Sequence, residues 1–588
     1  MRLLYLYASQ YECFKNQEFN FTSIRRFHYE YDDKRLFDER IDSKFPVKYF
    51  NYIDFCNPGQ SIDGPMPISE ITCVVGKNGC GKTTLSRLIC ELLHNRKINF
   101  KYIMVKEEND KIFCCHNISN LDLNVEEKDK IIEYRREDNC NSEIEDMEDN
   151  NSVFLYYSPV LTTEYVKFPQ LNCDLSTTYF FEHYSLERNY DYASVYSHYI
   201  SYENQNILRF LKANNSSLIK SKFSRILEGN HVRIILNIDG IKELQQVEKG
   251  KRKNSLDVSD DNRICRPLYH TECLFNETLK FEYNNKSLLI NIFQLYIASW
   301  LIQHWTGKLW VDSGTFQDDK SLEGEDPEKY FHKFEGIIKK INGNGIKENE
   351  IIEIIEKYGS YKTKKFFEEI TKINKKHNIL DIDESLAVVD LYYKLSLNHD
   401  IIFFEFEPKK SSGEKALLSM FSRIYKAIKD NYETGNKFII LFLDEVETTM
   451  HPEWQKECIY GIIEFIHTFF SELSFHIIFS SHSPLLLSDI PLNHVIYLDE
   501  HKNVTRQYNN CRTFAANMYS LYINSFFMRN GVMGKYAYNI LKGIFTSLKS
   551  NDNNLNKGEM EDYLSILKNV GDVLIREQLD EKIKSKKQ

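Results

Sequence analysis

One glycine-rich motif constrains the fold of this chain more than any other feature. Residues 76–83 read Gly-Lys-Asn-Gly-Cys-Gly-Lys-Thr, which fits the phosphate-loop pattern G-x-x-x-x-G-K-[ST]. The apolar run 71–75 precedes the motif, and apolar residues recur at helical spacing from Leu85 to Leu92 behind it. A strand, a glycine-rich loop and a helix in this order predict an α/β fold around a parallel sheet.

The chemistry of such a loop assigns a role to most of its residues. The glycines let successive backbone N–H groups turn toward bound phosphates, and the helix start adds the positive end of its dipole. Lys82 is expected to reach the β and γ phosphates, and Thr83 to offer its hydroxyl to Mg²⁺. A chance match in a glycine-rich turn is the alternative, which the flanking strand and helix make improbable. The predicted nucleotide-binding residues of this loop are Gly76, Lys77, Asn78, Gly79, Cys80, Gly81, Lys82, Thr83 and Thr84.

A second apolar run, residues 438–443, ends in two carboxylates, Asp444 and Glu445. An aspartate at the end of such a strand can hold Mg²⁺ through its hydration shell, so Thr83 and Asp444 are the predicted metal ligands. The following glutamate is placed to orient or deprotonate an attacking water, which makes Glu445 a candidate catalytic base. The alternative is a strand that merely ends in a charged turn, and the phosphate loop favours the catalytic interpretation.

A third motif, Lys-Ser-Ser-Gly-Glu-Lys at residues 410–415, opens an amphipathic helix. A serine hydroxyl and backbone amides at a helix start form a second cradle for an anion. The phosphate loop already occupies the nucleotide site of its own subunit. The second anion site, at residues 410–415, is therefore expected to bind the nucleotide of a second copy of the chain. Ser411 and Glu414 also fit a helix capping box, which is compatible with binding. The further candidate nucleotide-binding residues are Ser411, Ser412, Gly413 and Glu414.

A fourth motif, Ser-Ser-His-Ser-Pro at residues 480–484, follows the predicted strand 476–479. A lone histidine in a loop is usually polar surface. Because the three other motifs precede it in order, His482 is a second candidate catalytic residue.

Together these motifs resemble the heads of ABC-type ATPases. Residues 443–455 and 481–489 resemble the RecF/SMC/OLD-like members of that group more than transporter ATPases. The departures are Lys410, Ser412, Val446 and Met450, in place of the usual Leu, Gly, Pro and Leu. Over residues 1–115 and 386–535 the resemblance implies a P-loop NTPase of the ABC-ATPase head type. Its sheet is mixed or parallel and flanked by helices, with an antiparallel β subdomain and, in this chain, a large mainly helical insertion.

The resemblance also implies a function. In the resembled family the serine of the third motif grips the γ-phosphate of ATP held by the opposite subunit, and the histidine contacts the γ-phosphate and the attacking water. Ser411 and His482 take these roles here by resemblance. We therefore expect an ATPase that uses ATP and Mg²⁺ and acts as a homodimer or higher homo-oligomer.

The biological role is open between three hypotheses. The tail from residue 513 looks like that of stand-alone prokaryotic members, many of them in phage-defence operons, as in Septu-like systems. The first hypothesis is thus an ATP-gated sensor or regulator in antiphage defence. No acidic D-x-D cluster follows His482, so a separate nuclease or toxin is the expected effector. A RecF/SMC-like ATPase of DNA repair or chromosome maintenance is the alternative, and a transporter ATPase comes third.

Four regions are expected along the chain. Residues 1–160 form a first ATPase lobe with the phosphate loop and a β subdomain, in which the acidic stretch 126–149 is a solvated loop. Residues 161–385 form a mainly helical insertion without sustained heptads. Residues 386–510 form a second lobe that begins with strands at 386–391 and 401–406. Residues 511–588 form a helical tail.

Composition favours a cytoplasmic protein. The net charge of −10 argues against a surface devoted to nucleic acid, although Lys249, Lys251, Arg252 and Lys253, and Lys364 and Lys365, could touch DNA. Solvated helix ends are the simpler interpretation of these clusters. The 13 cysteines include no C-x-x-C pair, which indicates a reducing compartment. No signal peptide or membrane-spanning run is expected.

Overall fold

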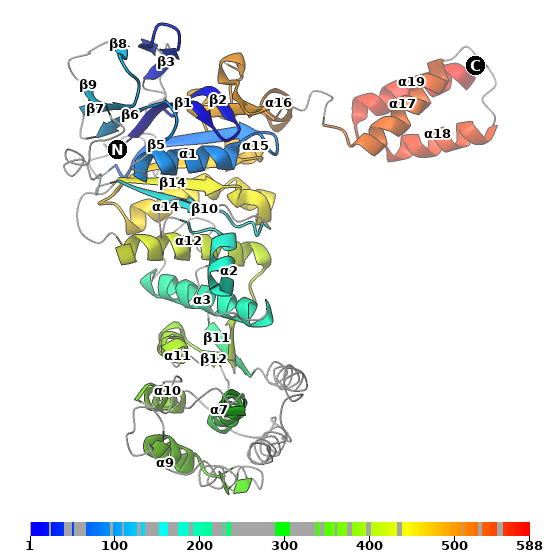
Figure 1. The fold of residues 1–588 in the computed structure, drawn as a ribbon. Coiled ribbons are helices and arrows are strands. Elements are labelled where there is room, and N and C mark those ends of the chain that lie inside the picture. Colours follow the sequence, from blue (N-terminus) through cyan, green and yellow to red (C-terminus); the bar gives the residue numbers. More distant parts are fainter. Residues whose placement is uncertain are drawn as a thin grey trace, which may run out of the picture. The chain divides into compact units, whose positions relative to one another are not determined.

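The computed structural model of the chain contains a mixed α/β core and further helices and sheets (Figure 1). It describes residues 2–22, 25–39, 50–51, 66–94, 98–108, 111–125, 131–135, 152–162, 168, 174–186, 192–214, 226, 231–236, 288–305, 336–337, 339–340, 346–358, 361–372, 379–394, 402–431, 438–508, 510–526, 532–549 and 557–587. The chain divides into two compact units, Met1–Ala515 and Ala516–Gln588.

A central sheet has the strand order β10-β14-β15-β5-β16-β17. Its first five strands pair in parallel, and β17 closes the edge in antiparallel pairing. The strands are β5 (Ile68–Gly76), β10 (Ser152–Tyr157), β14 (Phe438–Asp444), β15 (Ser474–Ser481), β16 (Val495–Asp499) and β17 (Lys502–Asn503). Nearly continuous apolar runs form these strands because both faces of a parallel sheet are buried. The predicted parallel sheet flanked by helices is confirmed.

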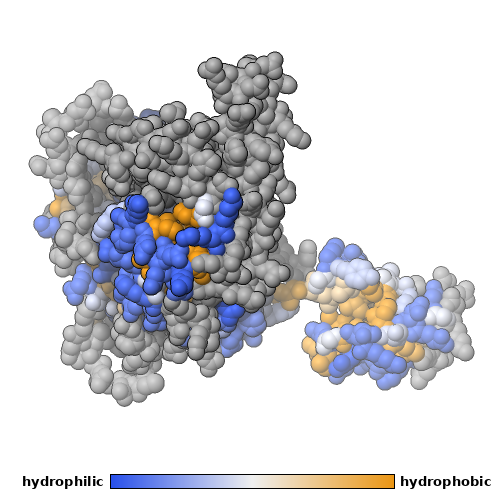
Figure 2. All heavy atoms as spheres, turned by 90° about the horizontal axis from the view of Figure 1, so that it is seen from below, coloured by the Kyte–Doolittle hydropathy of each residue, from blue (hydrophilic) through white to orange (hydrophobic). Residues whose placement is uncertain are grey.

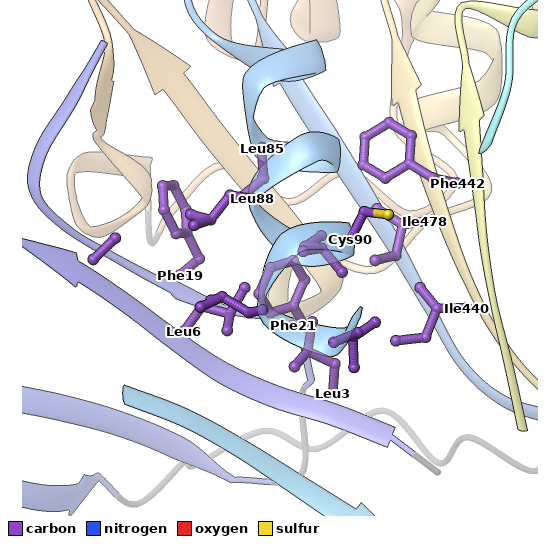
Figure 3. Packing of buried hydrophobic residues seen from close by; sticks show 14 of the residues in the cluster. Leu3, Leu6, Phe19, Phe21, Leu85, Leu88, Cys90, Ile440, Phe442 and Ile478 are labelled. Carbon is purple, nitrogen blue, oxygen red and sulfur yellow. The ribbon is translucent and has the colours of Figure 1, made fainter. Parts of the chain in front are cut away.

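Helix α1 (Lys82–His94) lies between the central sheet and a second, mostly antiparallel sheet. In Figure 3 its Leu85, Leu88 and Cys90 point toward side chains of both sheets, among them Phe19 and Ile440. The second sheet has the order β2-β1-β6-β7-β9, with β1 (Arg2–Tyr11), β2 (Phe14–Asn20), β6 (Tyr102–Glu108), β7 (Lys111–His116) and β9 (Ile131–Arg135). The amphipathic helix thus forms one core with the strands on either side of it.

One part of the acidic stretch 126–149 is not a loop, contrary to the sequence-based prediction. Residues Ile131–Arg135 form β9, which pairs in parallel with β7. Tyr134 stacks on Phe113 of that neighbour, with ring centroids 6.0 Å apart. Alternating apolar and charged residues suffice for an edge strand that is partly buried on one face. A smaller sheet joins β3 (Arg26–Glu30), β4 (Arg35–Glu39) and β8 (Asp122–Asn124).

The region between the two halves of the core is mainly helical and also contains a small sheet, β12-β11-β13. Its strands are β11 (His231–Leu236), β12 (Ile379–Leu380) and β13 (Ile402–Glu407), and its helices are α2 (Thr177–Leu186), α3 (Tyr192–Ala213), α7 (Leu288–Trp305), α9 (Glu348–Tyr358), α10 (Tyr361–Lys372) and α11 (Ile382–Lys394). The cluster Lys249, Lys251, Arg252 and Lys253 lies outside the described residues. Lys365 pairs with Glu368 on α10 at 2.8 Å.

The strand predicted at 386–391 is wrong, because these residues lie within α11. Asp381 and Glu384 form a capping box at its start: the Glu384 N–H donates to Asp381 Oδ1 at 2.8 Å, and the Asp381 N–H donates to Glu384 Oε2 at 3.2 Å. Leu386, Val388 and Val389 are buried, so the apolar run forms one face of a helix.

The second half of the core supplies α12 (Ser412–Asn431), α13 (Pro452–Gln455), α14 (Cys458–Phe469) and α15 (Pro484–Leu487). Helix α12 packs on α3, with Arg423 fully buried between them. The Arg423 Nε donates to Glu203 Oε1 at 2.7 Å, and its Nη1 donates to the Leu175 carbonyl at 2.9 Å. A buried ion pair with further hydrogen bonds therefore joins α12 to the helical region.

Residues Ala516–Gln588 contain α16 (Met518–Asn524), α17 (Lys535–Lys549), α18 (Lys557–Asn569) and α19 (Val573–Lys587). Leu541, Ile544, Leu548, Leu579 and Ile583 give this unit a core of its own. Apolar side chains also gather on its surface between charged ones (Figure 2), and Tyr536 and Leu574 are 81% and 70% exposed.

Within the described residues, no helix has both the length and the apolar character needed to cross a membrane.

Candidate functional site

The glycine-rich loop connects the end of β5 to the start of α1. Gly79 and Gly81 have φ angles of +73° and +107°, which other residues rarely adopt. At Gly76 a Cβ atom would lie 2.5 Å from the carbonyl oxygen of Leu498, so only glycine fits there without a shift of the backbone. Lys77 and Asn78 are exposed, Cys80 and Thr84 are buried, and Lys77 Nζ lies 2.9 Å from Asp499 Oδ1.

Lys82 joins the loop to residues that lie some 400 positions later in the chain. Its side chain is only 6% exposed, and its Nζ donates to the carbonyls of Gly76 and Lys77 at 3.3 Å each. The same nitrogen lies 2.7 Å from His482 Nε2 and 3.7 Å from Glu445 Oε1. His482 Nε2 is 3.2 Å from that Glu445 oxygen. The lysine and the two candidate catalytic residues thus form one cluster.

His482 Nε2 can serve only one of these partners at a time. When the nitrogen is unprotonated it accepts a hydrogen bond from Lys82, and when it carries a proton it donates to Glu445. The hydrogen bond from His482 and the charge of Lys82 lower the pKa of Glu445 against the opposing effect of burial. Glu445 is therefore a carboxylate near neutral pH, with the imidazole of His482 beside it.

The backbone at Glu445 holds its side chain in this place. Its φ of 51° lies in the left-handed region, which is uncommon for a residue other than glycine. Its N–H donates to the Ser480 carbonyl at 2.9 Å, so the end of β14 is tied to the end of β15. Strain at this residue is maintained by the surrounding sheet.

Asp444 is buried and accepts hydrogen bonds from three elements. Its Oδ2 accepts from Thr83 Oγ1 at 3.1 Å and from the Tyr156 hydroxyl at 2.6 Å. Its Oδ1 accepts from Ser480 Oγ, whose residue is its partner in the β14–β15 register. Burial raises the pKa of Asp444, and the three hydrogen bonds oppose that rise. The structure thus brings the two predicted metal ligands together.

Sequence reasoning missed Tyr156 and Glu447. Tyr156 lies on β10, one strand from Asp444, and the unbroken apolar run 153–157 was the signal for that strand. Glu447 lies in the short helical turn η6 (Val446–Thr449) and is 5% exposed. Its Oε1 accepts from Ser481 Oγ at 2.6 Å and from the His482 N–H at 2.8 Å. Glu447 lies within residues 443–455, which carry the family resemblance, and that stretch was the signal for it.

The third motif forms hydrogen bonds within its own helix start. Ser411 and Glu414 form the capping box: the Ser411 N–H donates to Glu414 Oε2 at 2.7 Å, and the Glu414 N–H donates to Ser411 Oγ at 3.3 Å. Ser411 and Ser412 are exposed, whereas Gly413 is buried. At Gly413 a Cβ would lie 2.8 Å from the Thr449 carbonyl and 3.2 Å from the Trp454 ring. The start of α12 therefore contacts η6 and α13.

Lys410, one of the departures from the family pattern, is buried. Its Nζ donates to the Ile226 carbonyl at 3.1 Å, and burial lowers its pKa.

Among the described residues, no group of three or more His, Cys, Asp or Glu side chains could hold a metal ion.

Comparison with protein families identifies the region that carries this site. A family model with the description AAA ATPase domain, AAA_15, matches residues 53–487 of the chain. The matched segment runs from before the glycine-rich loop to just beyond His482, and so includes all four motifs. The search of curated proteins gave no match.

Proposed function

Because the chain belongs to the AAA_15 family of AAA ATPase domains, we propose that its glycine-rich loop binds ATP and that Glu445 and His482 direct the hydrolysis of the γ-phosphate. The observation that carries the proposal is the cluster of Lys82, Glu445 and His482. A lysine, a carboxylate and an imidazole from three separate elements meet there, with 2.7–3.7 Å between their polar atoms. ATP binding and hydrolysis are what the family implies.

The residues of the loop would bind the phosphates through backbone amides and the lysine. Residues 76–84 lead into the start of α1, where the helix dipole and free N–H groups favour an anion. Lys82 would exchange its contacts with the Gly76 and Lys77 carbonyls for the β and γ phosphates. The other proposed contacts are those of Asn78, Gly79, Cys80, Gly81 and Thr84 along the same loop.

Thr83 and Asp444 would hold Mg²⁺. A hydroxyl and a carboxylate oxygen 3.1 Å apart are the hard oxygen donors that this ion prefers. When bound, Mg²⁺ supplies positive charge against the phosphate oxygens. The buried hydrogen bonds to Asp444 from Tyr156 and Ser480 keep its carboxylate in one orientation.

Glu445 is the proposed general base. Its lowered pKa keeps it ionised near neutral pH, so it can accept a proton from the attacking water. His482, 3.2 Å away, would orient that water and contact the γ-phosphate. His482 Nε2 lies within 3.2 Å of both Lys82 Nζ and Glu445 Oε1. It could therefore accept the proton that Glu445 takes from the water.

A second copy of the chain would complete the site. Ser411 and Ser412 are exposed at the first turn of α12, where free amides and a hydroxyl can grip an anion. The hydrogen bonds of Ser411 with Glu414 stay within the helix start of its own chain, and we propose that this start acts on the γ-phosphate held by a partner. Gly413 and Glu414 would shape and cap that helix start. A two-fold dimer with two such sites follows from mutual contact.

Replacement of Glu445 by Gln tests the proposal. We expect the rate of ATP hydrolysis by Glu445→Gln to fall by about 10²-fold or more. With ATP bound, the variant should stay a dimer, whereas the parent forms that dimer only transiently. ATPase assays and light scattering after gel filtration with and without ATP give the two measurements. Glu453→Gln, on exposed α13, is the matched control and should change neither. Parent-like hydrolysis in Glu445→Gln would disprove the assignment of the base.

For the biological role we propose an ATP-gated regulator of a separate nuclease or toxin in a cytoplasmic defence system. The structural support is the buried Arg423, which joins α12 to α2 and α3 of the helical region. A partner or trigger that moves that region would also move the helix that begins at Ser412. Purification with the products of neighbouring genes tests this role, and an ATP-independent complex or none would count against it.

A DNA-directed ATPase is the second candidate, and one helix favours it. Helix α17 contains three lysines, Lys535, Lys542 and Lys549, and no acidic residue. All three are exposed, and the first two lie 5.2 and 6.0 Å from the ring of Tyr538. Lysines beside exposed rings suit a phosphate backbone. Binding of DNA that weakens steeply with salt and is lost on Lys542→Glu would support this role.

A further inference from the structure

The carboxylate of Glu447 is hydrogen-bonded to the side chain of Ser481 and to the backbone of His482. It lies two positions after the proposed base, in the turn η6, and its carboxylate is buried. One oxygen, Oε1, accepts both the Ser481 hydroxyl at 2.6 Å and the His482 backbone N–H at 2.8 Å. A buried carboxylate is costly to desolvate unless it is hydrogen-bonded, so these two bonds fix the loop to the turn.

A second connection restrains the other side of the histidine. Gln455 donates from Nε2 to the carbonyls of Glu447 and Met450 at 3.2 and 3.1 Å. Its Oε1 accepts from Ser483 Oγ at 2.6 Å. Residues 481 and 483 are thus both held by the segment 447–455, and His482 lies between them. The backbone of the histidine has little freedom to move relative to β14.

We propose that Glu447 is the positioning residue of His482: it sets the backbone of residues 481–482 so that the imidazole Nε2 stays within reach of both Lys82 and Glu445. The proposal rests on the proposed ATPase function, in which His482 contacts the water and the γ-phosphate. The distances at stake are 2.7 Å to Lys82 Nζ and 3.2 Å to Glu445 Oε1. A displacement of about 1 Å is enough to cost on the order of 10²-fold in rate.

The two carboxylate oxygens of Glu447 differ in a way that makes the proposal testable. Oε1 makes both bonds to the loop, whereas Oε2 has no hydrogen-bond partner among the described residues. Positioning therefore requires one acceptor oxygen and not the negative charge. Glutamine keeps that acceptor but puts an N–H₂ group where no acceptor is found, which should lower the melting temperature and leave the loop in place.

The experiment compares Glu447→Ala and Glu447→Gln, each alone and combined with His482→Ala, in the full-length protein. We expect Glu447→Ala to lower kcat by about 10- to 100-fold with ATP affinity within about threefold of the parent. Glu447→Gln should stay within about threefold of the parent in kcat. In the His482→Ala background, Glu447→Ala should reduce kcat by less than about threefold, because the two residues act through one imidazole.

Hydrogen exchange of the peptide 480–485 gives a readout that does not depend on hydrolysis. The His482 amide, whose hydrogen goes to Glu447 Oε1, should exchange at least ~10-fold faster in Glu447→Ala and at the parent rate in Glu447→Gln. A purely structural role would instead lower stability in both variants without selective exchange at this loop. A parent protein without any ATPase activity would end the proposed function, while the exchange measurement would still test the positioning role.

Two results would overturn the inference. The first is a multiplicative loss of kcat in the double variant, which would show that Glu447 acts independently of His482. The second is an equal loss of kcat in Glu447→Gln and Glu447→Ala, which would show that its charge, and not its acceptor oxygen, is what matters.

Discussion

The hydroxyl of Tyr156 donates a 2.6 Å hydrogen bond to Oδ2 of Asp444, the same oxygen that accepts from Thr83. Tyr156→Phe would leave the strand intact and free this carboxylate oxygen on one side. We expect the Mg²⁺ concentration for half-maximal ATPase activity to rise about 10- to 100-fold, because a hydrogen bond to a charged group contributes roughly 1.5–3 kcal/mol. At saturating Mg²⁺, kcat should stay near that of the parent.

Tyr157→Phe is the matched control for that titration. Tyr157 is equally buried on β10, but its hydroxyl donates to the Ala416 carbonyl at 3.3 Å and not to Asp444. Its removal should leave the Mg²⁺ dependence unchanged. Equal shifts in both variants would mean that the sheet, and not the tyrosine–aspartate bond, controls the metal site.

Ser411→Arg should abolish hydrolysis while ATP binding to the isolated chain stays measurable. A long cation at the exposed helix start would block the face that a second copy must approach. Binding of a fluorescent ATP analogue and the dependence of ATPase rate on protein concentration provide the measurements. Glu414→Ala, which removes one side of the same capping box, controls for the loss of about 1 kcal/mol of helix stability. Full activity of Ser411→Arg would rule out the proposed dimer site.

Gly413→Ala should destabilise the contact between α12 and η6. The added Cβ would lie 2.8 Å from the backbone oxygen of Thr449, which cannot turn away as a side chain can. We expect a loss of roughly 1–3 kcal/mol in the free energy of unfolding, measured by denaturant titration. Gly543→Ala, where nothing lies within 4 Å of the new carbon, should be neutral or slightly stabilising. A neutral Gly413→Ala would show that the two elements can separate freely.

The stability of the chain should fall on acidification through His476. Burial lowers the pKa of this histidine to about 3, and the Leu3 N–H donates to its Nδ1 at 3.2 Å, which keeps the ring neutral. Below the unfolded pKa of about 6.5 the unfolded chain takes up a proton that the folded chain does not. Between pH 6.5 and pH 5 this costs about 2 kcal/mol.

His476→Gln should remove that part of the pH dependence. Urea titrations of the parent and the variant at several pH values give the difference directly, because other titrating groups are common to both. His451→Asn, at an exposed helix N-cap, should keep the pH profile of the parent. Parallel profiles for the parent and His476→Gln would show that the fold does not keep His476 neutral.

Local patterns in the sequence predicted the core elements because each of them carries its own signal. The run before Gly76, the run before Asp444 and the strand before His482 are all confirmed as neighbouring parallel strands. Their motifs follow these strands, so the meeting of Lys82, Glu445 and His482 at one edge was foreseeable. The strand predicted at 386–391 failed because a capping box outweighed a short apolar run.

Contacts that depend on register could not be foreseen. Tyr156 meets Asp444 only because β10 pairs with β14 so that Tyr156 lies opposite Phe442. Glu447 meets Ser481 only because η6 turns back over the end of β15. Both contacts join segments far apart in sequence, and a single sequence gives no measure of that pairing. The roles of the site residues and the division at 160, 385 and 510 stay predictions.

The order of strands in the central sheet has a consequence for synthesis of the chain. Strand β5 ends at Gly76, but the strands on either side of it, β15 and β16, begin at Ser474 and Val495. At roughly 5–20 residues per second, a ribosome needs on the order of 20–80 seconds to make the intervening stretch. The apolar strand β5 therefore stays without its two neighbours in the sheet until most of the polypeptide has left the exit tunnel. Chaperones that shield this strand during translation should set the yield of functional protein.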